Sequence, residues 1–210
     1  MFDDDQMAAG LLLDKLQDYR EFAKFYGSDF NSYSKAFWNE PLFSAGATRI
    51  RIVGLNTVLI SDKHDGLGQM ILTQNQYMLP RETNVEYVVM MHHPIDWLKN
   101  SRAVREYMEN RARICLMGHD HQLRVNHTTN LLGHERLEIY AGATNPSTTE
   151  HWHEFRYNWI EFSVLTTGES RELVVSLRPR VWTSATKFVA DRNQTVGNDE
   201  KVFRIVLPPI

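Results

Sequence analysis

Hydrophobic residues recur every three or four positions near the start of the chain, from Met7 to Tyr26, and the run ends before Gly27. This spacing gathers them on one side of a helix, and glycine is common just beyond a helix end. The pattern therefore predicts one amphipathic N-terminal helix within residues 1–26. The aspartates at positions 3–5 are interpreted as its N-terminal cap, where negative charge complements the helix dipole.

Short apolar runs replace this spacing further along the chain and predict strands. Residues 37–61 contain strand-like segments that are broken at Gly54 and Asn56. A short helix is expected over residues 73–79. Residues 85–91 (VEYVVMM) form a nearly continuous apolar run, which is typical of a strand covered on both faces.

A second buried strand follows an amphipathic helix. Residues 98–113 place Leu98, Val104 and Met108 on about one face of a predicted helix, and residues 114–117 (ICLM) form another short apolar run. Parallel strands need a crossover of about this length, usually a helix. The pattern therefore predicts a β–α–β unit with two adjacent parallel strands.

Beyond residue 130 the chain is rich in strand patterns and poor in helix patterns. The segment TTGES, residues 166–170, is typical of a hairpin turn. We expect a single α/β domain over residues 1–210, with an α/β core at 49–147 and a β-rich part at 148–210. The strands expected in this region are residues 136–143, 157–165, 171–182 and 201–208.

Composition narrows the classes of protein. The chain has 210 residues, 42% of them hydrophobic, and a net charge of −3, so no basic field indicates nucleic-acid binding. A single cysteine, Cys115, excludes a disulfide framework and is interpreted as a core residue. The acidic N-terminus does not resemble a signal peptide, and no apolar run reaches about 20 residues. We expect a cytoplasmic protein without a membrane segment.

Four histidines follow the two strands of the predicted β–α–β unit. His92 and His93 come directly after the first strand, and His119 and His121 come just after the second. Ligand sites of open α/β sheets lie at the carboxyl ends of parallel strands. Gly118 allows a tight turn and a close backbone approach there.

The spacing of the second pair suggests convergence. In an extended chain positions i and i+2 face the same side, so His119 and His121 are expected to converge while Asp120 points away. Neutral imidazole is a ligand suited to zinc, manganese, iron and similar ions. The four histidines therefore predict a metal site. The alternative is that nine histidines in this chain form two pairs by chance.

These residues carry a resemblance to a known family. VVMMHHP followed by CLMGHDH resembles the last two metal-binding motifs of the calcineurin-like metallophosphoesterases. The Gly-Leu-Asn strand with its Gln-containing helix, and the later segment LEIYAGATNPS, resemble neighbouring parts of that family, so the resemblance covers about residues 50–147. It implies that His92 and His119 bind one metal and that His121 binds a second.

The resemblance also implies supporting residues, a fold and a reaction. His93, Asp120, His151 and His153 are expected to support the ligands or contact the substrate. The implied fold is a four-layer α/β/β/α sandwich, here lacking its N-terminal strands. The implied reaction is hydrolysis of phosphomono- or diesters by water activated between two divalent ions such as Mn, Fe or Zn.

Three motifs of that family are absent from the sequence. No Gly-Asp-x-x-Asp and no Gly-Asn-His occurs, and the opening Asp-x-His is only mimicked by Asp62 and His64. Two further motifs and their strands do not fit between Gly66 and Val85, so Asp62 and His64 are interpreted as turn residues. Histidines without a bridging carboxylate do not hold two divalent ions close together against their repulsion.

Three interpretations follow. The first is the C-terminal part of a metal-dependent phosphoesterase with a phosphorylated substrate, completed by an N-terminal segment or a second chain. On this interpretation the isolated chain binds at most one ion and is inactive. The second is a catalytically inactive phosphoesterase-like module with a binding or regulatory role. The third is an unrelated α/β protein whose histidines are incidental.

Overall fold

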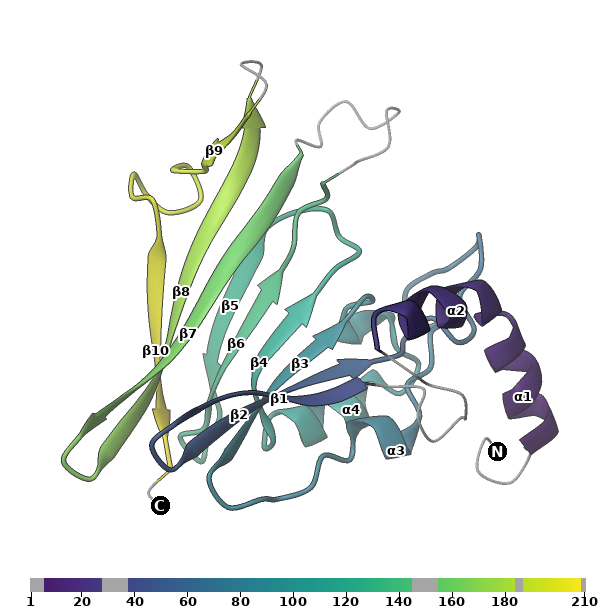
Figure 1. The fold of residues 1–210 in the computed structure, drawn as a ribbon, viewed down its shortest axis with the longest axis horizontal. Coiled ribbons are helices and arrows are strands. Elements are labelled where there is room, and N and C mark those ends of the chain that lie inside the picture. The colour runs from purple at the N-terminus through teal and green to yellow at the C-terminus, as the bar shows by residue number, and fades with distance from the viewer. Residues whose placement is uncertain (1–5, 28–37, 145–154, 184–186, 209–210) are drawn as a thin grey trace.

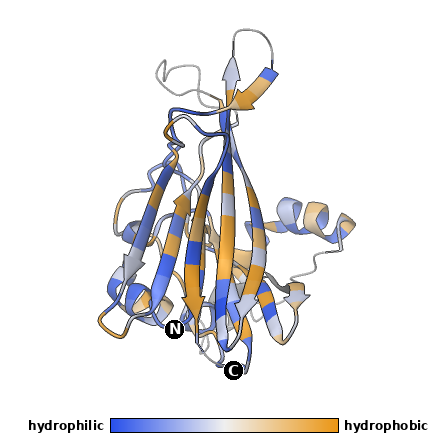
Figure 2. Ribbon diagram, turned by 90° about the vertical axis from the view of Figure 1, so that its left-hand side faces the viewer, coloured by the Kyte–Doolittle hydropathy of each residue, from blue (hydrophilic) through white to orange (hydrophobic). Residues whose placement is uncertain are grey.

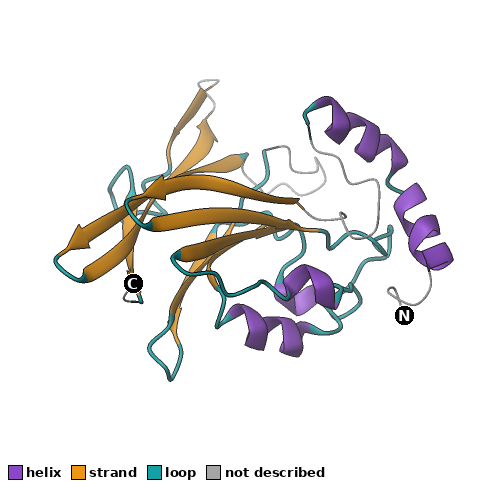
Figure 3. Ribbon diagram, turned by 60° about the horizontal axis from the view of Figure 1, so that its bottom comes forward, coloured by secondary structure: helices purple, strands orange, loops and turns teal. Residues whose placement is uncertain are grey.

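Two sheets packed face to face, with helices outside one of them, make up the fold (Figures 1 and 3). The computed structural model describes residues 6–27, 38–144, 155–183 and 187–208. The elements are α1 (Gln6–Asp14), α2 (Gln17–Phe25), β1 (Trp38–Ala45), β2 (Thr48–Leu55), α3 (Gln74–Tyr77), β3 (Val85–Met91), the 3-10 helix η2 (Ile95–Trp97), α4 (Ser101–Met108), β4 (Ala112–Met117), β5 (Arg124–Thr129), β6 (Glu135–Tyr140), β7 (Arg156–Thr167), β8 (Ser170–Thr183), β9 (Lys187–Ala190) and β10 (Lys201–Leu207).

The larger sheet is mixed and has six strands in the order β1-β2-β3-β4-β6-β5. Strands β2, β3, β4 and β6 pair in parallel, and β1 and β5 pair antiparallel at the two edges. Helix α4 connects β3 to β4, which confirms the predicted β–α–β unit. The smaller sheet is antiparallel, with β10, β8 and β7 in order and β9 paired to β8.

Two hydrophobic cores hold the layers together. One core lies between the larger sheet and the helices α3 and α4, and it contains Val89, Val104 and Cys115. The other lies between the two sheets, where Val88 and Ile114 meet the smaller sheet. Strands β3 and β4 are therefore covered on both faces, as their continuous apolar sequence predicts. The α/β class is confirmed, with a helix–sheet–sheet arrangement of layers.

The smaller sheet has one buried face and one open face. Along β8 buried and partly buried residues alternate, and Leu173, Val175 and Leu177 point into the core between the sheets. On the neighbouring strands Trp159 is 60% exposed and Val206 is 56% exposed. Figure 2 shows the same alternation as hydrophobic and hydrophilic bands along the strands. In the described part of the chain no helix packs on this open face.

The N-terminal segment forms two helices, so the prediction of one helix over residues 1–26 is wrong. The amide of Leu16 bonds to the carbonyl of Leu13 at 2.9 Å, in a turn that separates α1 from α2. This turn brings Leu13 and Leu16 together against Leu59 and Ile60. Most other apolar residues of the two helices stay exposed, including Phe25 at 85%. The aspartates at positions 3–5 lie outside the described residues.

Other predicted boundaries shift by a few residues. Residues 57–61 form a turn and not a strand. The Val58 amide donates a hydrogen bond to the Asn56 side-chain oxygen at 3.1 Å, and the Ser61 amide donates one to Val58 O at 3.1 Å. Strands β5 and β9 were not predicted. The hairpin between β7 and β8 is confirmed, with Gly168 at φ 60°.

Within the described ranges, no helix has both the length and the apolar character needed to cross a bilayer.

A polar group anchors the start of β3. Glu82 accepts hydrogen bonds from the Tyr87 hydroxyl at 2.8 Å and from Arg51. The Tyr87 bond is the largest influence on the carboxyl and, with the charge of Arg51, holds the pKa of Glu82 below its usual 4.5. Burial and the same bond raise the pKa of Tyr87 to about 12. The carboxylate therefore ties β2 to β3 at the edge opposite the histidines.

Substituting Leu173, which is fully buried between the sheets, is expected to destabilise the fold strongly. Leu173→Ala should lower the free energy of unfolding by about 2–5 kcal/mol, because it leaves a cavity in the core. Leu165→Ala is the matched control: Leu165 is 45% exposed on the adjacent strand, and a change of only about 0.5 kcal/mol is expected. Urea unfolding measures both. Equal losses would contradict the two-sheet core.

The Glu82 group predicts a pH-dependent contribution to stability. Because the folded pKa of Glu82 is lowered, its contribution is present above about pH 4.5 and is lost as the pH falls through the folded value. Glu82→Gln should cost about 1–2 kcal/mol at pH 7 and less below pH 4. Glu169→Gln, in the exposed hairpin turn, is the control. A Glu82→Gln effect of equal size at pH 3 and pH 7 would refute this account.

Candidate metal site at the ends of β3 and β4

The two strands that carry the histidines end side by side. Met91 is paired with Met117 in the parallel ladder, so His92 and Gly118 are the next residues on each strand. The Gly118 amide donates to Met91 O at 3.2 Å and to His92 O at 3.1 Å. A Cβ atom at position 118 would lie 3.3 Å from His92 Nδ1. Glycine therefore allows the chain after β4 to approach the His92 ring closely.

Three imidazole rings converge at this edge of the sheet. His92, His93 and His119 each offer a ring nitrogen, and these atoms all lie within 4.8 Å of one another. His119 Nδ1 lies 3.2 Å from His92 Nε2. Ring centroids are 5.1 Å apart for His92 and His119 and 4.9 Å apart for His93 and His119. The sequence placed these side chains at one edge, and the structure brings them into contact.

An indole ring lies against one side of the cluster. Trp97, in the 3-10 helix that follows Pro94, has its ring centroid 4.1 Å from that of His119 and 5.8 Å from that of His93. Sequence analysis did not identify Trp97. The motif His-His-Pro was the available signal, because the proline starts the turn that returns the chain toward the histidines.

The backbone of the Gly-His-Asp-His segment is not extended, and this corrects the geometric argument for His119 and His121. Both residues have positive φ, 70° for His119 and 56° for His121, so the i and i+2 rule for strands does not apply. His119 joins the convergent group, whereas His121 is outside it. His121 still lies near enough for its charge to lower the pKa of His92. Its role as a ligand stays a prediction.

Asp120 points to a neighbouring arginine. Its carboxylate accepts a hydrogen bond from Arg124 at 3.4 Å, and the Arg124 guanidinium lies 3.9 Å from the centre of the Tyr140 ring. Asp120 therefore contacts β5 and does not join the three converging rings. The two other predicted supporting residues, His151 and His153, lie outside the described residues.

His93 is buried and has partners on two sides. Its backbone amide donates to Thr57 Oγ1 at 3.2 Å, and its ring Nδ1 lies 3.1 Å from the same hydroxyl. Its Nε2 lies 3.4 Å from Asp65 Oδ2. Thr57 follows β2 closely, and Asp65 lies in the loop beyond it. This arrangement is consistent with the supporting role expected for His93.

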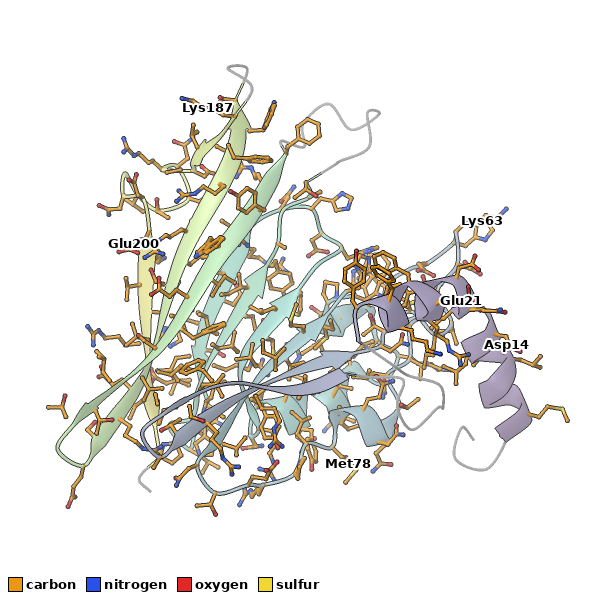
Figure 4. All side chains as sticks on the ribbon, in the orientation of Figure 1. Asp14, Glu21, Lys63, Met78, Lys187 and Glu200 are labelled. Carbon is orange, nitrogen blue, oxygen red and sulfur yellow. The ribbon has the colours of Figure 1, made fainter. Side chains whose placement is uncertain are left out.

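The loop that carries Asp65 is itself held by hydrogen bonds. Asp65 accepts from the Ser61 hydroxyl and from the Asp62 amide, the latter at 2.6 Å. Burial raises the pKa of Asp65, but these two bonds and the charge of His93 outweigh it, and the net shift is downward. Asp62 and His64 are exposed turn residues, as interpreted from the sequence. Figure 4 labels Lys63, which marks the outer end of this loop.

Sequence reasoning missed Thr57 and Asp65, and the chain offers no spacing that would reveal them. Asp65 lies 28 positions before His93 and beyond an intervening helix and strand. The family resemblance drew attention to Asp62 and His64 instead. Only the bend of the chain after β2 shows that the next aspartate is the one that reaches the histidines.

The electrostatic surroundings favour neutral imidazoles. The His92 ring remains open to solvent on one side, but its partial desolvation lowers its pKa, as do the charges of His93, His119 and His121. Burial is also the largest cause of the lowered pKa of His93, followed by the charge of His119, and Asp65 opposes it. Neutral imidazole is the form that binds metal ions.

The donor set fits one divalent transition metal. Imidazole nitrogens suit zinc, manganese, iron and similar ions, and the contacting rings of His92 and His119 can direct their nitrogens toward one ion. In the described part of the chain the convergent group contains no carboxylate. Cys115 is not available as a further ligand or nucleophile, because it is buried in β4 and burial raises the pKa of its thiol to about 12.

Comparisons with known proteins add little to this geometry. No protein-family model matches the chain, and no curated protein matches it. A crystal structure of a hypothetical protein from Thermus thermophilus is similar over 81% of this chain, with 12% sequence identity and a TM-score of 0.30. The chain spans 62% of the length of that protein. A similarity of this size carries no argument about fold or function.

The cluster predicts binding of one transition metal ion. Titration with Co²⁺ at pH 7.5, followed by visible absorption and calorimetry, should give a stoichiometry of one. His119→Ala and His92→Ala should weaken binding by more than the roughly 10–100-fold that loss of an outer partner costs, because each removes a direct ligand. His64→Ala removes an exposed turn histidine and should leave the affinity unchanged. Equal affinities for wild type and His119→Ala would exclude the site.

Proposed function

We propose that this chain supplies the histidine ligands of a metal-dependent phosphoester hydrolase. The observation that carries the proposal is the contact between His92 and His119 at the adjacent carboxyl ends of β3 and β4. These two residues stand in the His-His-Pro and Gly-His-Asp-His motifs that resemble the calcineurin-like metallophosphoesterases. Motif and geometry point to the same edge of the sheet.

Each histidine has a proposed role. His92 and His119 would hold one divalent ion, and His121, which lies close by, would hold a second ion in the assembled enzyme. His93 would orient the ligands from its buried position between Thr57 and Asp65. When bound, such ions lower the pKa of a coordinated water and neutralise charge on the phosphoryl group. Trp97 would limit the access of bulk water to the His119 side.

A complete two-metal site also needs carboxylates, and we propose that they come from an N-terminal segment or from a second chain. The sequence contains no Gly-Asp-x-x-Asp and no Gly-Asn-His. In this proposal the complete fold is the four-layer α/β/β/α sandwich, in which a further helix layer covers the smaller sheet. The exposed Trp159 and Val206 on the open face of that sheet support this arrangement.

An inactive phosphoesterase-like module with a binding or regulatory role is the alternative. It shares the fold and the histidines and differs only in whether the carboxylate ligands are ever supplied. An unrelated protein with incidental histidines is the weaker alternative, because unrelated strand-end histidines have no reason to bring ring nitrogens within 4.8 Å of one another beside a glycine that leaves room for the His92 ring.

Hydrolysis of bis(p-nitrophenyl) phosphate with Mn²⁺ tests the function. The chain alone should show turnover close to background, because the Gly-Asp-x-x-Asp motif that supplies the bridging carboxylate in the resembled family does not occur in its sequence. Expressed together with the polypeptide encoded directly upstream, it should become active if that polypeptide carries Asp-x-His and Gly-Asp-x-x-Asp. His119→Ala should abolish this activity, and His64→Ala should retain it.

The outcomes separate the interpretations. Activity of the assembled protein that needs His119 supports the hydrolase. Binding of metal without activity in any assembly supports the inactive module. Robust turnover by the pure chain alone, lost in His119→Ala, would contradict the proposal that the carboxylates come from elsewhere.

A further inference from the structure

We infer that Thr57 and Asp65 are positioning residues for the metal site: they hold His93 in one ring orientation, and His93 in turn holds the rings of His92 and His119. This inference rests on the proposed role of His92 and His119 as metal ligands. It assigns functions to two residues that the sequence motifs do not include.

Thr57 fixes both the backbone and the ring of His93. Its hydroxyl oxygen lies 3.2 Å from the His93 amide nitrogen and 3.1 Å from His93 Nδ1. Both residues are only 1% exposed, so water does not compete for these bonds. Because the amide belongs to the peptide that joins His92 to His93, the same hydroxyl also restricts the direction in which the His92 side chain leaves the backbone.

The partners of His93 select one tautomer. An ionised carboxylate only accepts hydrogen bonds, so the Nε2 atom that faces Asp65 carries the proton. Nδ1 is then the acceptor, and the Thr57 hydroxyl donates its hydrogen bond to it. The lone pairs of the Thr57 hydroxyl oxygen remain free to accept a hydrogen bond from the His93 amide. Every donor in this group meets an acceptor, and both ring nitrogens of His93 are engaged.

This assignment explains why His93 lies in the histidine cluster without being a ligand. A ring whose two nitrogens are both hydrogen-bonded has no lone pair left for an ion, so the ion is left to the neighbouring rings. The His93 ring touches both of them, with centroids 4.8 Å from His92 and 4.9 Å from His119. A fixed His93 ring therefore limits the rotation of the two proposed ligands.

Asp65 is itself fixed, which makes the support rigid. The Ser61 hydroxyl and the Asp62 amide donate to its two carboxylate oxygens. Its side chain is 14% exposed, while that of His93 is 2% exposed. The loop of residues 61–65 thus presents one carboxylate, already hydrogen-bonded, to the buried histidine. Partners of this kind typically change metal affinity by about 10–100-fold when they are removed.

The first test measures Co²⁺ affinity in substituted chains. Thr57→Val removes the hydroxyl with little change in shape, and Asp65→Ala removes the carboxylate; each should weaken Co²⁺ binding about 10–100-fold. Thr57→Ser keeps the hydroxyl and should restore binding to near the wild-type affinity. Asp65→Asn keeps an oxygen acceptor and should lose less than Asp65→Ala. His64→Ala, in the same loop, is the matched control.

Thermal melting of each variant without metal separates positioning from folding. A merely structural role would lower the melting temperature and leave the Co²⁺ affinity of the folded fraction unchanged, which would overturn the inference. Asp65→Ala keeps the test decisive if Thr57→Val does not fold, because Asp65 lies in a surface loop. Loss of affinity in both Thr57→Val and Thr57→Ser would also contradict the role of the hydroxyl.

The second test does not depend on metal. Long-range ¹H–¹⁵N spectra of the imidazole rings in the metal-free protein should show His93 as the Nε2–H tautomer, assigned by its absence in His93→Gln. Asp65→Ala should remove this preference. An Nδ1–H tautomer in the wild type would overturn the inference even if the metal site exists. If the wild type does not bind Co²⁺ through His119, the proposed function and the role of Thr57 and Asp65 in metal binding are both overturned. The tautomer of His93 still tests its hydrogen bonds to Thr57 and Asp65 in that case.

Discussion

The parallel pairing of β3 with β4 is the constraint on which the candidate site depends. The register that matches Met91 with Met117 brings both strands to an end at the same level, and the Gly118 amide extends the ladder by one more step to the carbonyls of Met91 and His92. A slip of one residue would turn the side chains of either strand to the opposite face. The two cores oppose such a slip, because each strand has apolar residues locked on both sides.

Imidazole rings held this close favour binding of a metal ion over protonation. Desolvation is the largest cause of the lowered pKa of His92, and the surrounding histidines lower it further, because each ring that takes up a proton makes protonation of its neighbours less favourable. A divalent ion shared by the rings avoids this repulsion, since one charge centre satisfies several nitrogens. The same contact that disfavours protonation therefore favours coordination, and Asp65 supplies a negative charge behind the cluster.

Much of this fold follows from local sequence patterns, and the exceptions have physical causes. β3 lies where its apolar run predicts, at Val85–Met91, because its buried residues are divided between the two cores. The histidines fell at the predicted edge for the same reason. Residues 57–61 are as apolar as a strand, but Leu59 packs against Leu13 of α1 and the chain turns. Periodicity cannot distinguish a buried turn from a short strand.

The parts of the site that could not be predicted from the sequence are contacts between segments far apart along the chain. The pairing of His93 with Thr57 and Asp65 joins segments 36 and 28 positions apart, and no local rule connects them. The left-handed backbone at His119 is equally invisible in the sequence, since such φ values are uncommon in residues other than glycine. The motif selected the candidate residues, whereas the fold decides which of them meet.

The small contact between the N-terminal helices and the loop after β2 has a consequence for dynamics. Leu13 and Leu59 are the buried centre of that contact, with Leu16 and Ile60 beside them, so among the described residues this hydrophobic cluster, which joins the N-terminal helices to the loop, is small. Segments held by small clusters and carrying many exposed apolar side chains, such as Phe22 and Phe25, open at a lower free energy than the core strands. The amide protons of α2 should therefore exchange with solvent by local opening, long before those of β3 and β4. Leu59 lies between Thr57 and Asp65, the two partners of the buried His93. Each such opening therefore removes the contact between Leu59 and Leu13 on the outer side of the segment that holds His93.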